Sequence, residues 1–310
     1  MMKKTDFKQE GDHYKLNKYQ KFYVDQKLVK EHLLKIIKFP VVVMDTEFFN
    51  RSHDKGNFDT QLYNEAEPSL IYTLSFSFAQ SYMDLLQRKN KKAISTLYVR
   101  RRYEQKHFNF KKTMDKMLTS FVNTCLTKEI KTLVFAGQSN DVRILERWIN
   151  QHPTLLNNKT TELFFRSKVT QKIEINTFDI YKTLENGFSF TNFNQTGIEF
   201  YNQKNLKPGK MGEKTVQLPG LAKFFDYFDS YYQGNFLAEK TNIYQLCISA
   251  LEFYTIPKFA DVEQFNSYNE KIREVRRHCQ NDVLKLLYLI NFIYVYGVNK
   301  NSKVVSDEKM

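Results

Sequence analysis

Cysteine is scarce in this chain of 310 residues, which contains only Cys125, Cys247 and Cys279. The three residues lie far apart, and no C-x-x-C pair is present. This spacing argues against a disulfide framework and against a zinc cluster, and it favours a reducing, cytoplasmic setting.

Long apolar segments are missing as well. The chain has no run of about 18 apolar residues, so we expect no transmembrane helix. Its N-terminal residues are polar and lead to no apolar run of the signal-peptide type. Internal repeats and an obvious linker between two cores are also absent from the sequence, which favours one domain.

Acidic residues are outnumbered by basic ones. The chain has 47 Lys and Arg against 34 Asp and Glu, which gives a formal net charge of +13. An excess of this size favours a polyanionic partner, with nucleic acid ahead of an anionic membrane surface. Because the lysines are scattered along the whole chain, a compositional bias explains part of the excess, and the charge is supporting evidence only.

The pattern of apolar residues predicts one α/β domain. We expect residues 1–25 to form a flexible basic arm, residues 26–298 a single domain and residues 299–310 a disordered tail. Strands first, and then strands that alternate with helices, indicate a mixed sheet covered by helices. The predicted helices are 26–38, 110–126, 141–149, 218–228, 241–254 and 267–296, and the predicted strands are 41–47, 70–78, 94–100, 131–135 and 172–178.

The most informative segment runs from Phe39 to Phe49. Its apolar, β-branched centre predicts a buried strand that ends in two carboxylates, Asp45 and Glu47. Positions i and i+2 of a strand share one face, so the two acids point the same way. Two like charges this close repel each other unless something neutralises them, and hard oxygen ligands suit Mg²⁺ or Mn²⁺.

A D-x-E pattern is weak evidence by itself, since about one match is expected by chance in a chain of this length. Asp261 and Glu263 form a second copy, which follows no strand-like run. We interpret that copy as solvated surface. Asp45 and Glu47 differ because an apolar strand carries them inward.

Two more segments carry candidate ligands. Asp141 follows an apolar strand that turns at Gly137, and it opens the next helix. His278 and Asp282 lie four residues apart on the last helix, so they share one face. Taken singly, Asp141 is better explained as a favourable charge at a helix N-terminus, and His278 and Asp282 as an exposed pair on an amphipathic helix.

Taken together and in this order, the three elements resemble the DEDD 3′–5′ exonuclease superfamily. The resemblance covers about residues 39–296. It implies a ribonuclease H-like fold, in which an antiparallel meander and parallel strands form a mixed five-stranded sheet flanked by helices. Asp45 and Glu47 match the first exonuclease motif, Asp141 matches the second and Asp282 the third, while His278 matches the position of the general base.

The resemblance implies hydrolysis of phosphodiester bonds at 3′ ends, with release of nucleoside monophosphates and with two Mg²⁺ or Mn²⁺ ions. Asp45 would bridge both ions, Glu47 and Asp282 would each bind one, and Asp141 would act directly or through water. A histidine with an ordinary pKa of about 6.5 can take a proton from water at neutral pH. The implied catalytic residues are therefore His278 and Glu47.

The chain departs from the family pattern in three respects. Gly137 stands where an Asn is common, and Phe48 and Phe49 follow the first motif in place of a pair such as Thr-Thr. His278 lies four residues before Asp282, a spacing that is typical of the tyrosine branch of the superfamily rather than of the histidine branch.

Several aromatic and basic residues are candidates for nucleic-acid contacts. Phe48 and Phe49 can stack on terminal bases, although core packing is the preferred interpretation for one of them. The basic candidates for backbone contacts, which solvated charge explains equally well, are Arg100, Arg101, Arg102, Lys207 and Lys210. We expect single-stranded 3′ ends of DNA or RNA as the partner, and no membrane.

Three alternatives stay open. In the first, the chain is a catalytically inactive ribonuclease H-like protein that binds nucleic acid or assists a polymerase. In the second, it is a related metal-dependent endonuclease. In the third, it is a structural α/β protein whose acids fall in this order by chance. Metal binding separates the first from an enzyme, and the reaction products separate an endonuclease from an exonuclease.

Overall fold

A five-stranded sheet forms the centre of the fold. The computed structural model describes residues 7–11, 13–15, 21–50, 69–87, 93–105, 107–137, 140–156, 161–190, 225 and 242–298. The sheet has the order β10-β7-β4-β5-β6. Its strands are β4 (Val41–Asn50), β5 (Ser69–Ala79), β6 (Ser95–Tyr98), β7 (Thr132–Phe135) and β10 (Thr177–Asp179).

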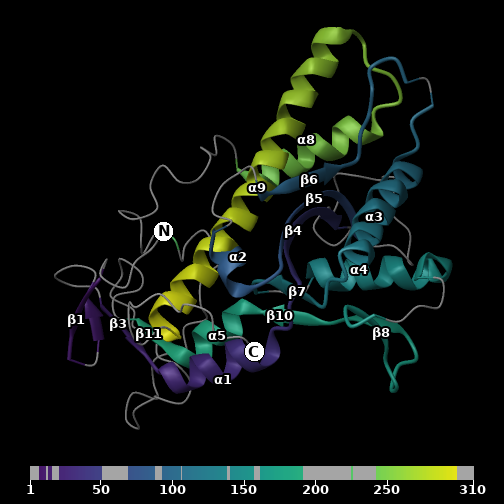
Figure 1. Cartoon of the computed structure of the whole chain (residues 1–310). Helices are drawn as coiled ribbons and strands as arrows, with labels where there is room; N and C mark the ends of the chain where they lie inside the picture. Colours follow the sequence, from purple (N-terminus) through teal and green to yellow (C-terminus); the bar gives the residue numbers. More distant parts are fainter. Residues whose placement is uncertain are drawn as a thin grey trace, which may run out of the picture.

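The sheet is mixed, as predicted. Strands β4, β5 and β6 form an antiparallel meander, while β7 runs parallel to β4 and β10 runs parallel to β7 (Figure 1). The expected α/β class with a five-stranded mixed sheet is therefore confirmed, and the arrangement is consistent with a ribonuclease H-like fold.

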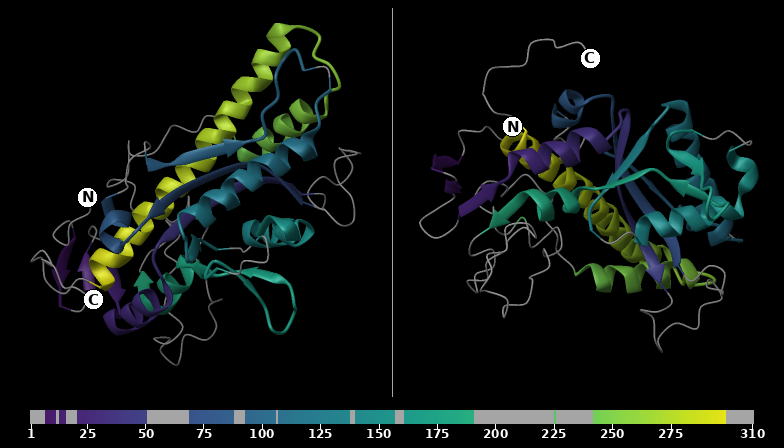
Figure 2. Two further views of the ribbon diagram at one scale, coloured as in Figure 1. Left: turned by 45° about the vertical axis from the view of Figure 1, so that its right-hand side comes forward. Right: turned by 90° about the horizontal axis from the view of Figure 1, so that it is seen from below.

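Helices cover both faces of the sheet. Figures 1 and 2 show α3 (Phe110–Thr127) and α4 (Asn140–Gln151) on one face, and α9 (Val262–Gly297) running diagonally along the other. The remaining α-helices of the described residues are α1 (Gln26–Ile36), α2 (Tyr82–Gln87), α5 (Ile180–Gly187) and α8 (Ile243–Thr255), and a 3₁₀ helix spans Pro153–Leu156. No helix in these described ranges combines the length and the apolar character needed to cross a lipid bilayer.

Strand β4 is buried on both faces. Val41, Val42 and Val43 have no exposed surface, as expected for a central strand with a continuous apolar run. Val42 and Met44 pack in a first core with α3, α4 and α8. Val41 and Val43 pack in a second core with α1, α5 and the C-terminal half of α9.

The end of β4 departs from simple alternation. Asp45 and Glu47 continue the series of side chains that faces the second core. The register between β4 and β5 then shifts between Glu47 and Phe48, which is a β-bulge. A bulge re-aims the side chains that follow it, and Phe49 accordingly joins the first core rather than the side of the two acids.

Helix α9 begins earlier than the predicted residue 267. Asp261 is its N-cap, because the Asp261 side chain accepts a hydrogen bond from the backbone N–H of Gln264 at 2.7 Å. Glu263 follows in the exposed first turn. The second D-x-E is thus a helix start at the surface, which confirms its interpretation as solvated.

Helix α9 also links the two cores. Ile272 and Val275 in its N-terminal half belong to the first core, and Val283 and the apolar residues that follow belong to the second. The segment from His278 to Asp282 lies between these two anchored halves, so both cores fix its position.

The expectation of a flexible arm at residues 1–25 is wrong where the structure describes this segment. Strands β1 (Lys8–Glu10), β2 (His13–Lys15) and β3 (Lys21–Val24) pair with β11 (Phe188–Phe190) in a four-stranded antiparallel sheet. Phe7, Tyr14 and Phe22 are buried against aromatic residues of β11 and of the end of α9. In the sequence, these aromatic residues stand among charged ones, and their packing partners are distant along the chain. The segment therefore has no local pattern of apolar residues that would predict strands.

The predicted strand at 172–178 is also wrong as one element. Asn176 interrupts it, since its backbone N–H donates to Leu163 O and its side chain to Lys131 O, both at 2.8 Å. The first part, β9 (Ile173–Ile175), forms a hairpin with β8 (Phe164–Arg166), and only β10 joins the main sheet. Most of the predicted helix at 218–228 and the whole predicted tail at 299–310 lie outside the described residues.

Val29 of α1 packs against two helices at positions where glycine leaves room for it. A Cβ on Gly187 of α5 or on Gly297 of α9 would overlap a methyl group of Val29, which has no exposed surface. Any larger residue at these two positions must therefore push α1 away from the second core.

We expect Gly187→Ala to lower the free energy of unfolding by about 1–3 kcal/mol, because the added methyl group overfills this contact. Urea denaturation followed by circular dichroism measures the change. Val29→Ala makes room for the methyl group, so the double variant should be more stable than the sum of the two single effects predicts. Strict additivity would contradict the proposed overlap.

Candidate metal centre

Strand β4 supplies two carboxylates. Asp45 and Glu47 face α9, and Glu47 is only 9% exposed. Cys279 of α9 lies directly against them, and its Sγ donates a hydrogen bond to the backbone carbonyl of Asp45 at 3.3 Å. Strand and helix are therefore locked together at the place where the acids project.

Helix α4 supplies the third carboxylate. The chain turns after β7 at Gly137, whose φ of +85° suits glycine, and the backbone N–H of Gly137 donates to Asp179 Oδ1 at 3.0 Å. Asp141 follows in the first turn of α4 and accepts a short hydrogen bond from the Thr46 hydroxyl. Thr46 stands between the two acids of β4, so this bond joins α4 to the same end of the sheet.

Helix α9 supplies the fourth carboxylate and a histidine. His278 Nδ1 lies 3.0 Å from Glu47 Oε1 and 3.6 Å from Asp282 Oδ2. Lys285, one turn further along and only 6% exposed, places its Nζ 2.8 Å from Asp282 Oδ1. We call Asp45, Glu47, Asp141 and Asp282 the acid cluster, and it brings together all four predicted metal ligands and the predicted base.

The electrostatics of the acid cluster favour a bound cation. Burial raises the pKa of Asp45 well above its usual range, and the charges of Asp282, Asp141 and Glu47 raise it further. Burial also raises the pKa of Glu47 to about 7, although the hydrogen bond from His278 opposes the shift. The pKa of Asp141 rises to about 6 through burial, against the hydrogen bond from Thr46. A divalent ion would remove this repulsion.

The donor atoms are close enough to bind a metal ion. The ligating atoms of Asp45, Glu47 and Cys279 lie within 4.8 Å of one another, and so do those of Glu47, His278 and Asp282. Carboxylate oxygens suit Mg²⁺ and Mn²⁺, and the imidazole suits Mn²⁺ and related ions. These residues can therefore hold a metal ion between β4 and α9.

Sequence reasoning missed Thr46, Cys279 and Lys285. Lys285 stands three residues after Asp282 on a helix, which is a spacing that brings side chains together, so it was open to prediction. Thr46 and Cys279 carried no comparable signal, because their roles depend on how β4, α4 and α9 meet in space.

The structure corrects the predicted role of Phe49. Its ring is buried and stacks on Tyr72 of β5, with the ring centroids 4.2 Å apart. The bulge after Glu47 turns this side chain into the first core, so it cannot stack on a terminal base. Phe48 is half-buried against the same core.

Arg101 is also a structural residue rather than a nucleic-acid contact. Its guanidinium is buried, donates to the carbonyls of Phe253, Ile256 and Pro257, and packs over the ring of Phe259 at 4.4 Å. It thereby satisfies carbonyl groups at the C-terminal end of α8 that the helix leaves unpaired. A charge enclosed in this way cannot reach a phosphate.

The other basic candidates divide into two groups. Arg100 and Arg102 are exposed, and Arg100 packs over the Tyr98 ring at 5.4 Å. Their contact with nucleic acid stays a prediction. Lys207 and Lys210 lie outside the described residues.

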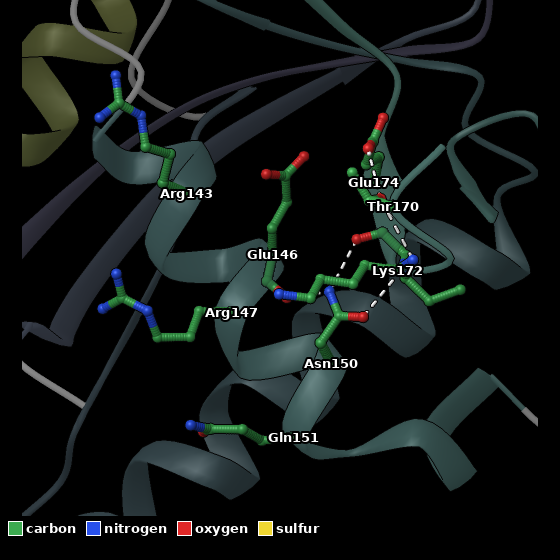
Figure 3. Close-up of a pocket in the computed structure, with 9 residues that line it drawn as sticks. Arg143, Glu146, Arg147, Asn150, Gln151, Thr170, Lys172 and Glu174 are labelled. Atoms are coloured by element: carbon green, nitrogen blue, oxygen red, sulfur yellow. Dashed lines mark hydrogen bonds between the residues drawn. The ribbon is translucent and has the colours of Figure 1, made fainter. Parts of the chain in front are cut away.

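A surface cavity of about 420 Å³ lies between α4 and the β8–β9 hairpin (Figure 3). Arg143 and Arg147 reach outward from α4, and Lys172 comes from the hairpin. Residues two apart on a helix are separated by about 200° around its axis, so Asp141 and Arg143 point to opposite sides of α4. The cavity is therefore separate from the acid cluster.

The polar residues in the floor of this cavity hold the hairpin in place. Glu146 Oε1 accepts the backbone N–H of Ile175 at 2.9 Å. Asn150 accepts the backbone N–H of Ile173 at 2.9 Å and donates to its carbonyl at 2.8 Å. Glu146 and Asn150 therefore have a structural role, which is to hold the β8–β9 hairpin against α4.

The raised pKa values predict how stability depends on pH without divalent ions. Glu47 keeps its proton up to about pH 7 in the folded protein, compared with 4.5 for an ordinary glutamate, so the folded state binds more protons in this window. The free energy of unfolding should therefore fall as the pH rises from about 5 to about 8. Saturating Mn²⁺ should remove the fall, and urea denaturation across this range measures both.

Asp45→Asn serves as the diagnostic variant here. It removes one of the repelling charges, so without metal it should be more stable than the wild type above about pH 7 and less sensitive to pH. Glu263→Gln, in the exposed first turn of α9, should follow the wild type. If the stability of the wild-type protein instead rises over this pH window, the carboxylates of the acid cluster do not repel one another as proposed.

Arg101→Met should lower the free energy of unfolding by about 1.5–3 kcal/mol, because the carbonyls at the end of α8 lose a charged donor. Arg100→Met, on the exposed neighbour, should change it by about 0.5 kcal/mol or less. Thermal or urea denaturation of the two variants makes the comparison. Equal effects would contradict the buried role of Arg101.

No protein-family model matches the chain, and no curated protein matches its sequence. The function is therefore inferred from the side chains that β4, α4 and α9 bring together.

Proposed function

We propose that this chain is a divalent-metal-dependent phosphodiesterase that acts on nucleic acid as a 3′–5′ exonuclease. The observation that supports this most strongly is the meeting of four carboxylates from β4, α4 and α9 at one end of a ribonuclease H-like sheet, with His278 Nδ1 3.0 Å from Glu47. The proposed cofactors are two Mg²⁺ or Mn²⁺ ions, and the proposed products are nucleoside monophosphates.

The residues of the acid cluster have distinct proposed roles. When bound, the ions supply an acidified water and stabilise charge on the phosphate and on the leaving oxygen. Asp45 is central to the acid cluster, because Asp282, Asp141 and Glu47 all act on its carboxylate, and it suits a bridging ligand. Glu47 and Asp282 flank His278 and orient its ring, and the imidazole takes the proton of the attacking water.

Nucleic acid is the proposed substrate because of the charge of the chain and its exposed arginines. The net charge of +13 attracts a polyanion, and Arg100 and Arg102 face solvent at the end of β6. Single-stranded 3′ ends are the proposed target, since they can reach a site recessed between a strand and a helix without unpairing.

One observation favours the inactive alternative as a second candidate. Lys285 already neutralises Asp282 from a buried position, with 2.8 Å between Nζ and Oδ1, and in that respect it competes with a metal ion. An inactive nucleic-acid binder would keep this ion pair. Calorimetric titration with Mn²⁺ separates the two candidates, because only an enzyme of the proposed kind binds the ion.

The proposed function predicts metal-dependent degradation of end-labelled single-stranded DNA or RNA. Asp45→Ala and Asp282→Ala should lose this activity in both Mg²⁺ and Mn²⁺. His278→Ala should slow it by about 100-fold or more, as expected for removal of a general base. Gel analysis of the labelled products measures rate and pattern together.

Glu263→Ala is the matched control, because Glu263 belongs to the other D-x-E of the chain and is exposed. This variant should degrade the substrate at the wild-type rate. Wild-type rates for Asp45→Ala would disprove the proposal, and internal fragments in place of a mononucleotide ladder would assign an endonuclease.

A further inference from the structure

The cavity between α4 and the β8–β9 hairpin is bordered by basic side chains from both elements. Arg143 and Arg147 of α4 lie four residues apart, so they share one face of the helix, with their Cβ atoms about 5–6 Å apart. Figure 3 shows Lys172 extending from the hairpin toward α4. All three residues are exposed, and neither Arg147 nor Lys172 forms an ion pair with another described residue. Three cations therefore converge on an open cavity of about 420 Å³.

The two carboxylates of this cavity already hold hydrogen bonds of the hairpin. Glu146 Oε1 accepts the backbone N–H of Ile175 at 2.9 Å. Glu174 Oε1 accepts the hydroxyl of Thr170 at 3.0 Å. The acids of the cavity thus serve its structure, and the basic side chains at its border are available to an anion from solvent.

The hairpin adds more positive charge beside the cavity. Arg166 and Lys168 are exposed, and Glu174 is the one acidic residue of segment 164–175. The turn of the hairpin is ordered, because the backbone N–H of Ser167 donates to Lys172 O at 2.9 Å. Since Asn150 also fixes the hairpin against α4, the basic residues of the two elements keep their relative positions without a ligand. Such preorganisation lowers the cost of binding.

An exposed aromatic ring accompanies these charges. Phe165 is 38% exposed and pairs with Glu174 across the hairpin, so the two side chains share one face, and Glu174 lines the cavity. Cations that contact phosphates, together with an aromatic ring on which a base can stack, are typical of surfaces that bind single-stranded nucleic acid. An acidic polypeptide would use the charges but would leave the ring without a stacking partner.

We infer that the cavity and the hairpin form a second binding site, for the sugar–phosphate backbone of single-stranded nucleic acid. The inference rests on the proposed function for the kind of partner, but it does not depend on a metal ion. Arg143, Arg147 and Lys172 contact phosphates, and Phe165 stacks on a base. Because Arg143 and Asp141 point to opposite sides of α4, this site holds a part of the strand other than the 3′ end at the acid cluster.

The double variant Arg143→Gln/Arg147→Gln is the test. Fluorescence anisotropy with a labelled oligothymidylate of about 20 nucleotides, in EDTA, measures binding without divalent ions and without hydrolysis. The variant should bind about tenfold more weakly than the wild type at about 0.1 M salt. Two lost phosphate contacts should also reduce the slope of log K against log salt by about 1.4, since each contact contributes about 0.7 for a single strand.

Phe165→Ala separates stacking from charge. Loss of one stacked base should weaken binding about fivefold or more and leave the salt slope unchanged, because no phosphate contact is lost. Unchanged affinity in this variant would overturn the assignment of the ring.

Lys112→Gln/Lys116→Gln is the matched control. These two lysines are exposed, lie four residues apart on α3, and border a surface hollow lined by residues 112–128. Their removal lowers the net charge by the same amount, so it should change the affinity by about twofold or less. Both double variants should keep the wild-type melting temperature, because all four side chains are exposed.

Each remaining outcome has a definite reading. Equal weakening by the two double variants would assign binding to the net charge of the chain and overturn the inference, as would unchanged affinity in the arginine variant. The same loss with labelled polyglutamate would overturn it in favour of an acidic protein partner. A wild type that binds the oligonucleotide but neither binds Mn²⁺ nor degrades nucleic acid would disprove the proposed function and leave this site standing.

Discussion

The crowding of four carboxylates at the end of one buried strand is the constraint on which the rest of the structure depends. Folding must bring Asp45 and Glu47 against Asp141 and Asp282 although all four repel one another, and burial raises the pKa of three of them. The two hydrophobic cores supply the stabilisation that holds them there. Helix α9 belongs to both cores, so the segment from His278 to Asp282 cannot withdraw unless one core opens.

Much of the acid cluster could be predicted because its signals are local. The apolar run at Val41–Val43 predicts a central strand, and i, i+2 spacing places Asp45 and Glu47 on one face. The i, i+4 spacing does the same for His278 and Asp282 on a helix. The meander and the parallel strand β7 follow from the order of apolar segments, and the fold class is correct for that reason.

What could not be predicted depends on contacts between distant segments. From the sequence, Phe49 and Arg101 are candidates for nucleic-acid contacts at the surface. In the structure, a β-bulge directs the Phe49 side chain into the first core, and the end of α8 encloses Arg101. Phe7, Tyr14 and Phe22 lie among charged residues, and their aromatic partners are in β11 and α9. For Arg101 and these three aromatic residues, the environment is made by an element more than a hundred residues away, whereas Phe49 is enclosed partly by the neighbouring strand β5.

Arg101 couples the unfolding of the α8–α9 hairpin to the unfolding of the sheet edge. Two helices joined by a short turn would, alone, open and close locally at that turn. Here such an opening would pull a guanidinium away from its carbonyl acceptors and out of its aromatic surroundings. We therefore expect the hairpin and the sheet to unfold as one cooperative unit, with the amide hydrogens in the last turn of α8 exchanging with solvent only as fast as the domain itself unfolds.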